Sequence, residues 1–112
     1  MTKYLVLYTA PTSASETMAT ATPEQMKASM DEWIAWRDAA SKTATIDFGL
    51  PLQSVGRITQ DGVTASTSQV SGYATIEGES KDAIMALLRT HPHLRRPGAT
   101  IEVLEMLPMP GL

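Results

Sequence analysis

The stretch "VSGYATIEGESKDAIMALLRTHPHLRRPGATIEVLEM", residues 70–106, carries a complete strand–helix–strand unit. Residues 70–77 alternate between small or apolar and more polar side chains, which is the period of a strand. Residues 79–91 have the apolar spacing of a helix, with Ser80 as the expected N-cap. Residues 99–106 are again rich in strand-forming side chains. The C-terminal half of the chain therefore predicts two strands joined by a helix.

The N-terminal half follows the same order. Residues 3–9, "KYLVLYT", read as a strand, and the small polar residues 12–22 read as a loop. A helix is predicted over residues 22–42, because Thr22 can cap it and proline follows at its first position. Extended segments fill residues 44–77, with a hairpin turn at Asp61-Gly62.

Two such units in one chain predict an α+β fold of the ferredoxin-like βαββαβ type, with an antiparallel sheet and two helices on one face. Residues 1–112 form a single domain of ordinary size. The first strand is apolar on both faces, whereas the helices cover only one face. We therefore expect a homodimer in which one sheet faces the other.

Composition narrows the classes of partner and compartment. The net charge of −3 disfavours nucleic acids and anionic membranes, which select basic surfaces. The chain has no cysteine and no apolar run long enough to cross a membrane, so we expect a cytoplasmic protein. It has no phosphate-binding glycine loop, nucleophile elbow or zinc motif, so no cofactor is expected.

Four stretches of the chain carry a family resemblance when taken in order: "KYLVLY", "WIAWRDAASKTATIDFGLPL", "VSGYATIEGESKDAIMALLRTHPHL" and "GATIEVLEMLPMPG". Together they resemble the YCII-related family, also called the DGPF-domain family, of the dimeric α/β barrel superfamily. The chain departs from the family where many members have Asp-Gly-Pro-Phe, since it reads "QDGVTAST" there.

The resemblance implies a dimeric α/β barrel with a pocket between the sheet and the helices of each protomer. Some relatives in the superfamily are cofactor-free enzymes that act on small organic molecules. Some family members resemble accessory or sensory domains linked to transcription regulators.

His91 and His93 flank Pro92 between the second helix and the last strand. In one interpretation, His91 caps the C-terminus of the helix as a cation and His93 bonds the backbone of the loop. In the other, at least one of them is a general acid or base, since histidine titrates near neutral pH. A metal site is disfavoured because two histidines need further ligands, and the spacing of Asp47 and Glu77 does not indicate one.

Asp47 lies in "TIDFGLPL", before a glycine and a proline. It either bonds its own backbone in a turn or orients a histidine as a catalytic carboxylate. The resemblance places the acidic residue of the family on Asp47, so the catalytic hypothesis assigns proton transfer to His93 or His91 and orientation to Asp47.

Several aromatic and basic side chains are candidates for ligand binding. Trp33 is expected in the core, whereas Trp36 lies off the centre of the helix stripe and could line a pocket. Arg37 either extends to water or enters that pocket. Together with Arg57, Arg95 and Arg96 it could attract an anionic ligand, but Arg95 and Arg96 are interpreted as solvated loop charges. The predicted ligand-binding set is Tyr8, Trp36, Arg37, Arg57 and Tyr73.

Three functions remain open at the level of sequence. The first is a homodimeric, cofactor-free enzyme that uses histidine and aspartate on a small organic molecule. The second is a non-catalytic module of the same fold that binds a small ligand or a partner. The third is a domain that serves mainly for dimerisation. Convergence of the imidazoles and Asp47 in a pocket would favour the first.

Overall fold

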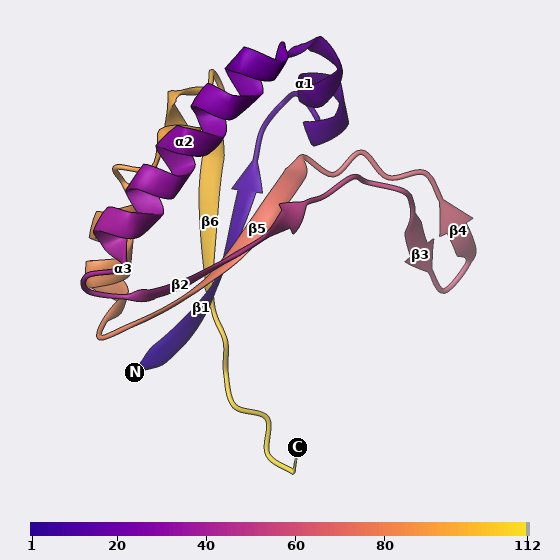
Figure 1. Ribbon diagram of the computed structural model, residues 1–112. Coiled ribbons are helices and arrows are strands. Elements are labelled where there is room, and N and C mark those ends of the chain that lie inside the picture. The colour runs from indigo at the N-terminus through magenta and orange to yellow at the C-terminus, as the bar shows by residue number, and fades with distance from the viewer. Residues whose placement is uncertain (112) are drawn as a thin grey trace.

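The computed structural model describes residues 1–111 and has an α+β fold built on a four-stranded antiparallel sheet (Figure 1). Residues 70–106 form the strand–helix–strand unit that their pattern predicts. In chain order the elements are β1 (Thr2–Thr9), α1 (Ala14–Thr20), α2 (Pro23–Ala40), β2 (Thr45–Pro51), β3 (Arg57–Thr59), β4 (Gly62–Thr64), β5 (Val70–Gly78), α3 (Lys81–Leu88), the 3-10 helix η1 (Pro92–Arg95) and β6 (Thr100–Glu105).

The strands of the main sheet lie in the order β2-β5-β1-β6, and every neighbouring pair is antiparallel. β1 is central because it pairs with β5 on one side and with β6 on the other. This order is consistent with the ferredoxin-like arrangement expected from the sequence. The pairing of β1 with β5 shifts register between Tyr8 and Thr9, opposite Gly72, where a glycine in the strand pattern had suggested a bulge.

α2 and α3 pack on the same face of the sheet. Tyr4, Val6 and Tyr8 alternate along β1 toward this face and are buried, as are Ala74 and Ile76 of β5. The helices contribute Trp36, Ala40, Ile84 and Leu88 to the same core. On the opposite face, the side chains of Leu5 and Leu7 are only half-buried.

Local capping explains where the helices begin. The Thr22 side chain accepts a hydrogen bond from the Gln25 backbone N–H, and the Gln25 side-chain oxygen accepts one from the Thr22 backbone N–H, which closes a capping box on α2. Ser80 caps α3 as predicted. The prediction of a loop over residues 12–22 is wrong, because Ser13 caps the short helix α1 by accepting from the Glu16 backbone.

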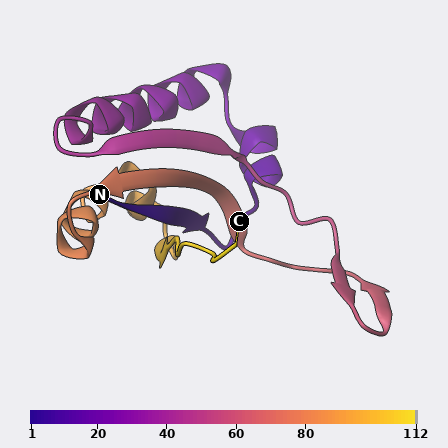
Figure 2. The same cartoon turned by 90° about the horizontal axis from the view of Figure 1, so that it is seen from below.

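The β3–β4 hairpin lies apart from the main sheet (Figures 1 and 2). Its two turn residues are 60 and 61, one position before the predicted Asp61-Gly62 pair, because Gly62 already pairs with Thr59 as the first residue of β4. Gly62 has a φ of 132°, a conformation that favours glycine. The apolar side chains of Ile58 and Val63 on this hairpin are exposed. Among residues 1–111, no helix has the length and apolarity to span a bilayer.

Candidate functional site

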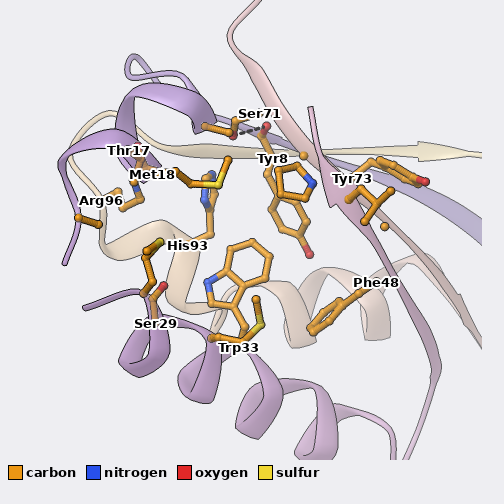
Figure 3. Close-up of a pocket in the computed structure, with 18 of the residues that line it drawn as sticks. Tyr8, Thr17, Met18, Ser29, Trp33, Phe48, Ser71, Tyr73, His93 and Arg96 are labelled. Carbon is orange, nitrogen blue, oxygen red and sulfur yellow. Dashed lines mark hydrogen bonds between the residues drawn. The ribbon is translucent and has the colours of Figure 1, made fainter. Parts of the chain in front are cut away.

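A cavity of ≈ 460 Å³ lies between the N-terminal half of α2, the helix α1 and the neighbouring ends of β1, β2 and β5 (Figure 3). Most of its wall is aromatic, aliphatic or thioether surface. The apolar lining comprises Tyr8, Ala14, Met18, Ala21, Met26, Met30, Trp33, Phe48, Leu50, Pro51 and Tyr73. The volume and the apolar wall are typical of sites that take small organic molecules.

The cavity exists because only the C-terminal part of α2 reaches the core. The buried residues of this helix are Trp36 and Ala40, near its C-terminus. Residues 23–32 of the helix are exposed, including Met26, and Met30 keeps 55% of its surface open. These methionines therefore border the cavity with about half of their surface open, and their flexible side chains can adapt to a ligand.

One formal charge lies in the cavity wall. Arg96 lines the cavity next to His93, and the described residues contribute no aspartate or glutamate to this wall. The Arg96 guanidinium donates from Nη2 to the Thr17 hydroxyl of α1 at 3.0 Å. The remaining polar lining is neutral and comes from Thr17, Gln25, Ser29, Ser71, Gly72 and Gly49. The cavity therefore combines an apolar body with one cationic end.

His91 and His93 are both buried, each with 2% of its surface exposed, so neither is a solvated loop residue. His91 caps η1, because its Nδ1 accepts from the His93 backbone N–H at 3.0 Å. In the neutral ring Nε2 then carries the hydrogen and donates it to the Tyr8 hydroxyl, 3.2 Å away. The expectation that His91 acts as a cation at the end of α3 is wrong.

His93 bonds the backbone, as one interpretation of the sequence proposed. Its Nε2 donates to the carbonyl oxygen of Thr9 at 2.9 Å, which joins η1 to the end of β1. Of the two histidines, His93 lines the cavity, and Figure 3 shows its ring beside Met18 and Thr17. His91 lies behind it, with ring centroids 4.4 Å from both Trp33 and Trp36.

Burial controls the titration of this cluster. Desolvation, with a smaller contribution from His93, lowers the pKa of His91 to about 4. Desolvation also lowers the pKa of His93, and the nearby Arg96 charge adds to that shift, although the Thr9 and Thr100 carbonyls oppose it. Burial raises the pKa of Tyr8. Both imidazoles are therefore neutral at pH 7.

The predicted pairing of a histidine with Asp47 is wrong, because the structure places Asp47 away from both histidines. On β2, Ile46 and Phe48 point toward the core, and Phe48 packs against Trp33. Asp47 lies between them and therefore alternates to the open face of the sheet, where it is exposed. The polar partners of the histidines are instead the Tyr8 hydroxyl and the Thr9 carbonyl.

The two tryptophans exchange their predicted positions. Trp33 lines the cavity, with its ring centroid 4.8 Å from that of Tyr8. Trp36 is in the core, and its Nε1 donates to the Leu87 carbonyl and the Thr90 hydroxyl, each at 3.2 Å. The apolar side chains spaced along one side of α2 predict a single buried face. They do not show where the sheet beneath that face ends, and therefore which tryptophan borders the cavity.

Of the predicted ligand-binding residues, Tyr8 and Tyr73 line the cavity. Figure 3 shows Tyr8 extending toward Trp33 and Phe48, whereas the Tyr73 hydroxyl points away from them. Arg37 is outside the lining and places its guanidinium 5.2 Å from the centroid of the Phe48 ring. Arg57 is exposed on the separate hairpin.

The sequence did not predict the α1 side of the cavity, and the interpretation of Arg96 as a solvated loop charge is corrected by its place in the cavity lining. A signal for α1 was present, because Ser13 and Glu16 have the spacing of a helix N-terminus. Arg96 had no comparable signal, since its neighbour Arg95 looks the same in sequence yet is exposed and pairs with Glu32. Among residues 1–111, no group of three or more potential metal ligands comes together.

No family model matches the chain, and no curated protein matches it either. The resemblance to YCII-related proteins therefore stays a prediction, and the functional argument depends on the geometry of the cavity.

Proposed function

We propose that the protein binds a small, largely apolar organic molecule in the cavity beneath α2. The observation that carries this proposal is the ≈ 460 Å³ cavity itself, with its wall of aromatic and methionine side chains. Met18 and Met30 are half exposed at its border. A ligand that covers this apolar surface removes it from water, which is favourable.

The probe for this proposal is N-phenyl-1-naphthylamine, a neutral dye whose emission rises in apolar surroundings. We expect saturable binding to the wild-type protein, together with quenching of the Trp33 fluorescence in a Trp36→Phe background. Ser29→Phe, on the cavity wall, should abolish binding because the ring fills the space. Ala28→Phe is the matched control, since Ala28 is the preceding exposed residue of the same helix and does not line the cavity. Equal binding by both variants would contradict the proposal.

A second candidate function is proton transfer on the bound molecule, and the position of His93 favours it. A neutral imidazole in a cavity wall can act as a base, and the lowered pKa keeps His93 neutral at pH 7. Acetophenone in D₂O is a suitable probe, because a base removes its methyl protons and deuterium replaces them. We expect exchange catalysed by the wild type and lost in His93→Gln; equal rates would leave binding as the function.

We further propose that the fold is ferredoxin-like and that two copies pack sheet to sheet as a dimeric α/β barrel. Leu5 and Leu7 of β1 and Leu104 of β6 lie on the face that the helices leave open. Sedimentation velocity tests this: Leu7→Glu should yield monomers, whereas Ala28→Glu on the far side of α2 should leave the dimer intact. A wild-type monomer at micromolar concentration would refute it.

A further inference from the structure

The cavity has a positive charge at one end, from Arg96, although the rest of its described wall is uncharged. The whole chain carries a net charge of −3, yet Arg96 is the only formally charged residue in the cavity lining that the structure describes. No carboxylate among residues 1–111 lies within ion-pair distance of the Arg96 guanidinium, whereas Arg95 pairs with Glu32 and Arg37 lies beside Asp38. Of these three arginines, the one that faces the cavity is the one without a carboxylate.

The Arg96 side chain is also held in place. Its Nη2 donates to the Thr17 hydroxyl of α1, and Figure 3 shows Arg96 and Thr17 together at one end of the cavity, near His93. A guanidinium has five N–H donors, so this single bond leaves donors for a planar, two-oxygen acceptor. A fixed guanidinium loses less conformational freedom on binding than a freely moving one.

We propose that the ligand of this cavity is an organic acid with one carboxylate, which Arg96 binds while the apolar part of the molecule packs against Met30, Trp33 and Phe48. This inference rests on the proposed function and specifies its ligand. The charge at one end and the aromatic wall at the other set both the polarity and the orientation of the molecule. A cationic ligand does not fit, because Arg96 would repel its charge at one end of the cavity and apolar side chains would surround it at the other. A dianionic ligand does not fit, because its second charge would lie against apolar side chains.

His93 provides an internal reporter of the bound anion. The positive charge of Arg96 lowers the pKa of His93, so the two side chains sense each other's field. A carboxylate on Arg96 cancels that charge and adds a negative one near the imidazole, and both effects favour the protonated ring. Occupation of the site by an acid should therefore raise the pKa of His93, whereas a neutral molecule of the same shape should not.

The experiment uses octanoate and octanamide, which share a chain and differ in charge, as competitors of N-phenyl-1-naphthylamine on the full-length protein. We expect octanoate to bind about tenfold more tightly than octanamide. Arg96→Gln should remove this preference by weakening octanoate alone. Arg95→Gln, the matched control at the neighbouring position, should retain it. Equal affinities of the wild type for the two competitors, or a preference that survives Arg96→Gln, would overturn the inference.

A second measurement on the wild type avoids any effect of substitution on folding. NMR titration of the His93 Cε1–H resonance should show a higher pKa with saturating octanoate than with octanamide. An unchanged pKa with octanoate bound would overturn the assignment of the carboxylate to Arg96. The dye separates the two proposals. If the dye binds but octanoate binds no more tightly than octanamide, only the inference of an acidic ligand is wrong. If the dye, octanoate and octanamide all fail to bind, the cavity is refuted as a binding site.

Discussion

Acidification below about pH 6.5 should destabilise the protein because of His91. This ring is buried between Trp33 and Trp36 and accepts a backbone hydrogen bond at Nδ1. Protonation of Nδ1 would place a second N–H against the His93 N–H and a charge inside an apolar cluster. The unfolded chain has neither restriction, so it takes up the proton first as the pH falls.

The size of the effect follows from the two pKa values. In the folded state the pKa of His91 is about 4, and in the unfolded chain it is near the usual ~6.5. Since the folded value is the lower one, stability is lost as the pH falls from ~6.5 toward ~4 and is fully present above that window. The linkage relation gives a loss of about 2 kcal/mol between pH 7 and pH 5, and His93 adds to the loss in the same direction.

Urea denaturation at pH 7, 6 and 5 measures this loss as the change in the free energy of unfolding. His91→Asn is the informative variant, because the amide oxygen can still accept from the His93 backbone but does not titrate. We expect it to be less stable than the wild type at pH 7, since it leaves space beside the tryptophans. Its further loss from pH 7 to pH 5 should nevertheless be smaller by about 2 kcal/mol.

Val6→Ala is the control for this experiment, because Val6 is a fully buried core residue that does not titrate. It should lower stability at every pH and keep the wild-type loss between pH 7 and pH 5. Equal losses in the wild type and in His91→Asn would refute the reasoning, since the acid sensitivity would then come from groups other than the buried imidazole.

Three further predictions concern the elements that shape the cavity. Gly49→Ala should lower the free energy of unfolding in urea by about 1–3 kcal/mol, because the added Cβ would lie 2.4 Å from the Tyr73 ring. If this contact is the cause, Gly49→Ala should have almost no effect in a Tyr73→Ala background. Trp36→Phe should cost about 1 kcal/mol or more by removing the Nε1–H donor to Leu87 and Thr90, and a stability equal to the wild type would refute that role. Thr22→Ala should cost about 1 kcal/mol by opening the capping box of α2, whereas Thr22→Ser should cost much less.

The periodicity of the chain predicted the elements of the main sheet and its two longer helices because those patterns are local. Thr22 and Ser80 mark helix starts through bonds that span three residues. The Asp61-Gly62 pair predicted the β3–β4 hairpin to within one position, because the turn residues are 60 and 61 and Gly62 begins β4. The helix α1 was missed because its residues are small and polar and none of them is buried. The stripe on α2 likewise predicted a buried face without distinguishing core from cavity.

The candidate site was harder to predict because its members come from separate elements. Trp33 lines the cavity and Trp36 does not, but this difference depends on how far the sheet extends beneath α2. His91 and His93 differ in the same way: they are two residues apart, yet one supports the Tyr8 hydroxyl and the other borders the cavity. The sequence pattern of α2 does not show which tryptophan lines the cavity, and the sequence of η1 does not show which histidine does.

The correction to Asp47 has a consequence for the chemistry of the cavity. A carboxylate beside His93 would have held a catalytic imidazole, as the sequence suggested, but it would also have placed a negative charge close to Arg96. The structure holds His93 with the Thr9 carbonyl instead, which orients the ring and carries no charge. Because Asp47 lies on the opposite face of the sheet, the Arg96 charge is left uncompensated within the described cavity wall. The same arrangement that weakens the case for a histidine–aspartate enzyme therefore strengthens the case for an anionic ligand.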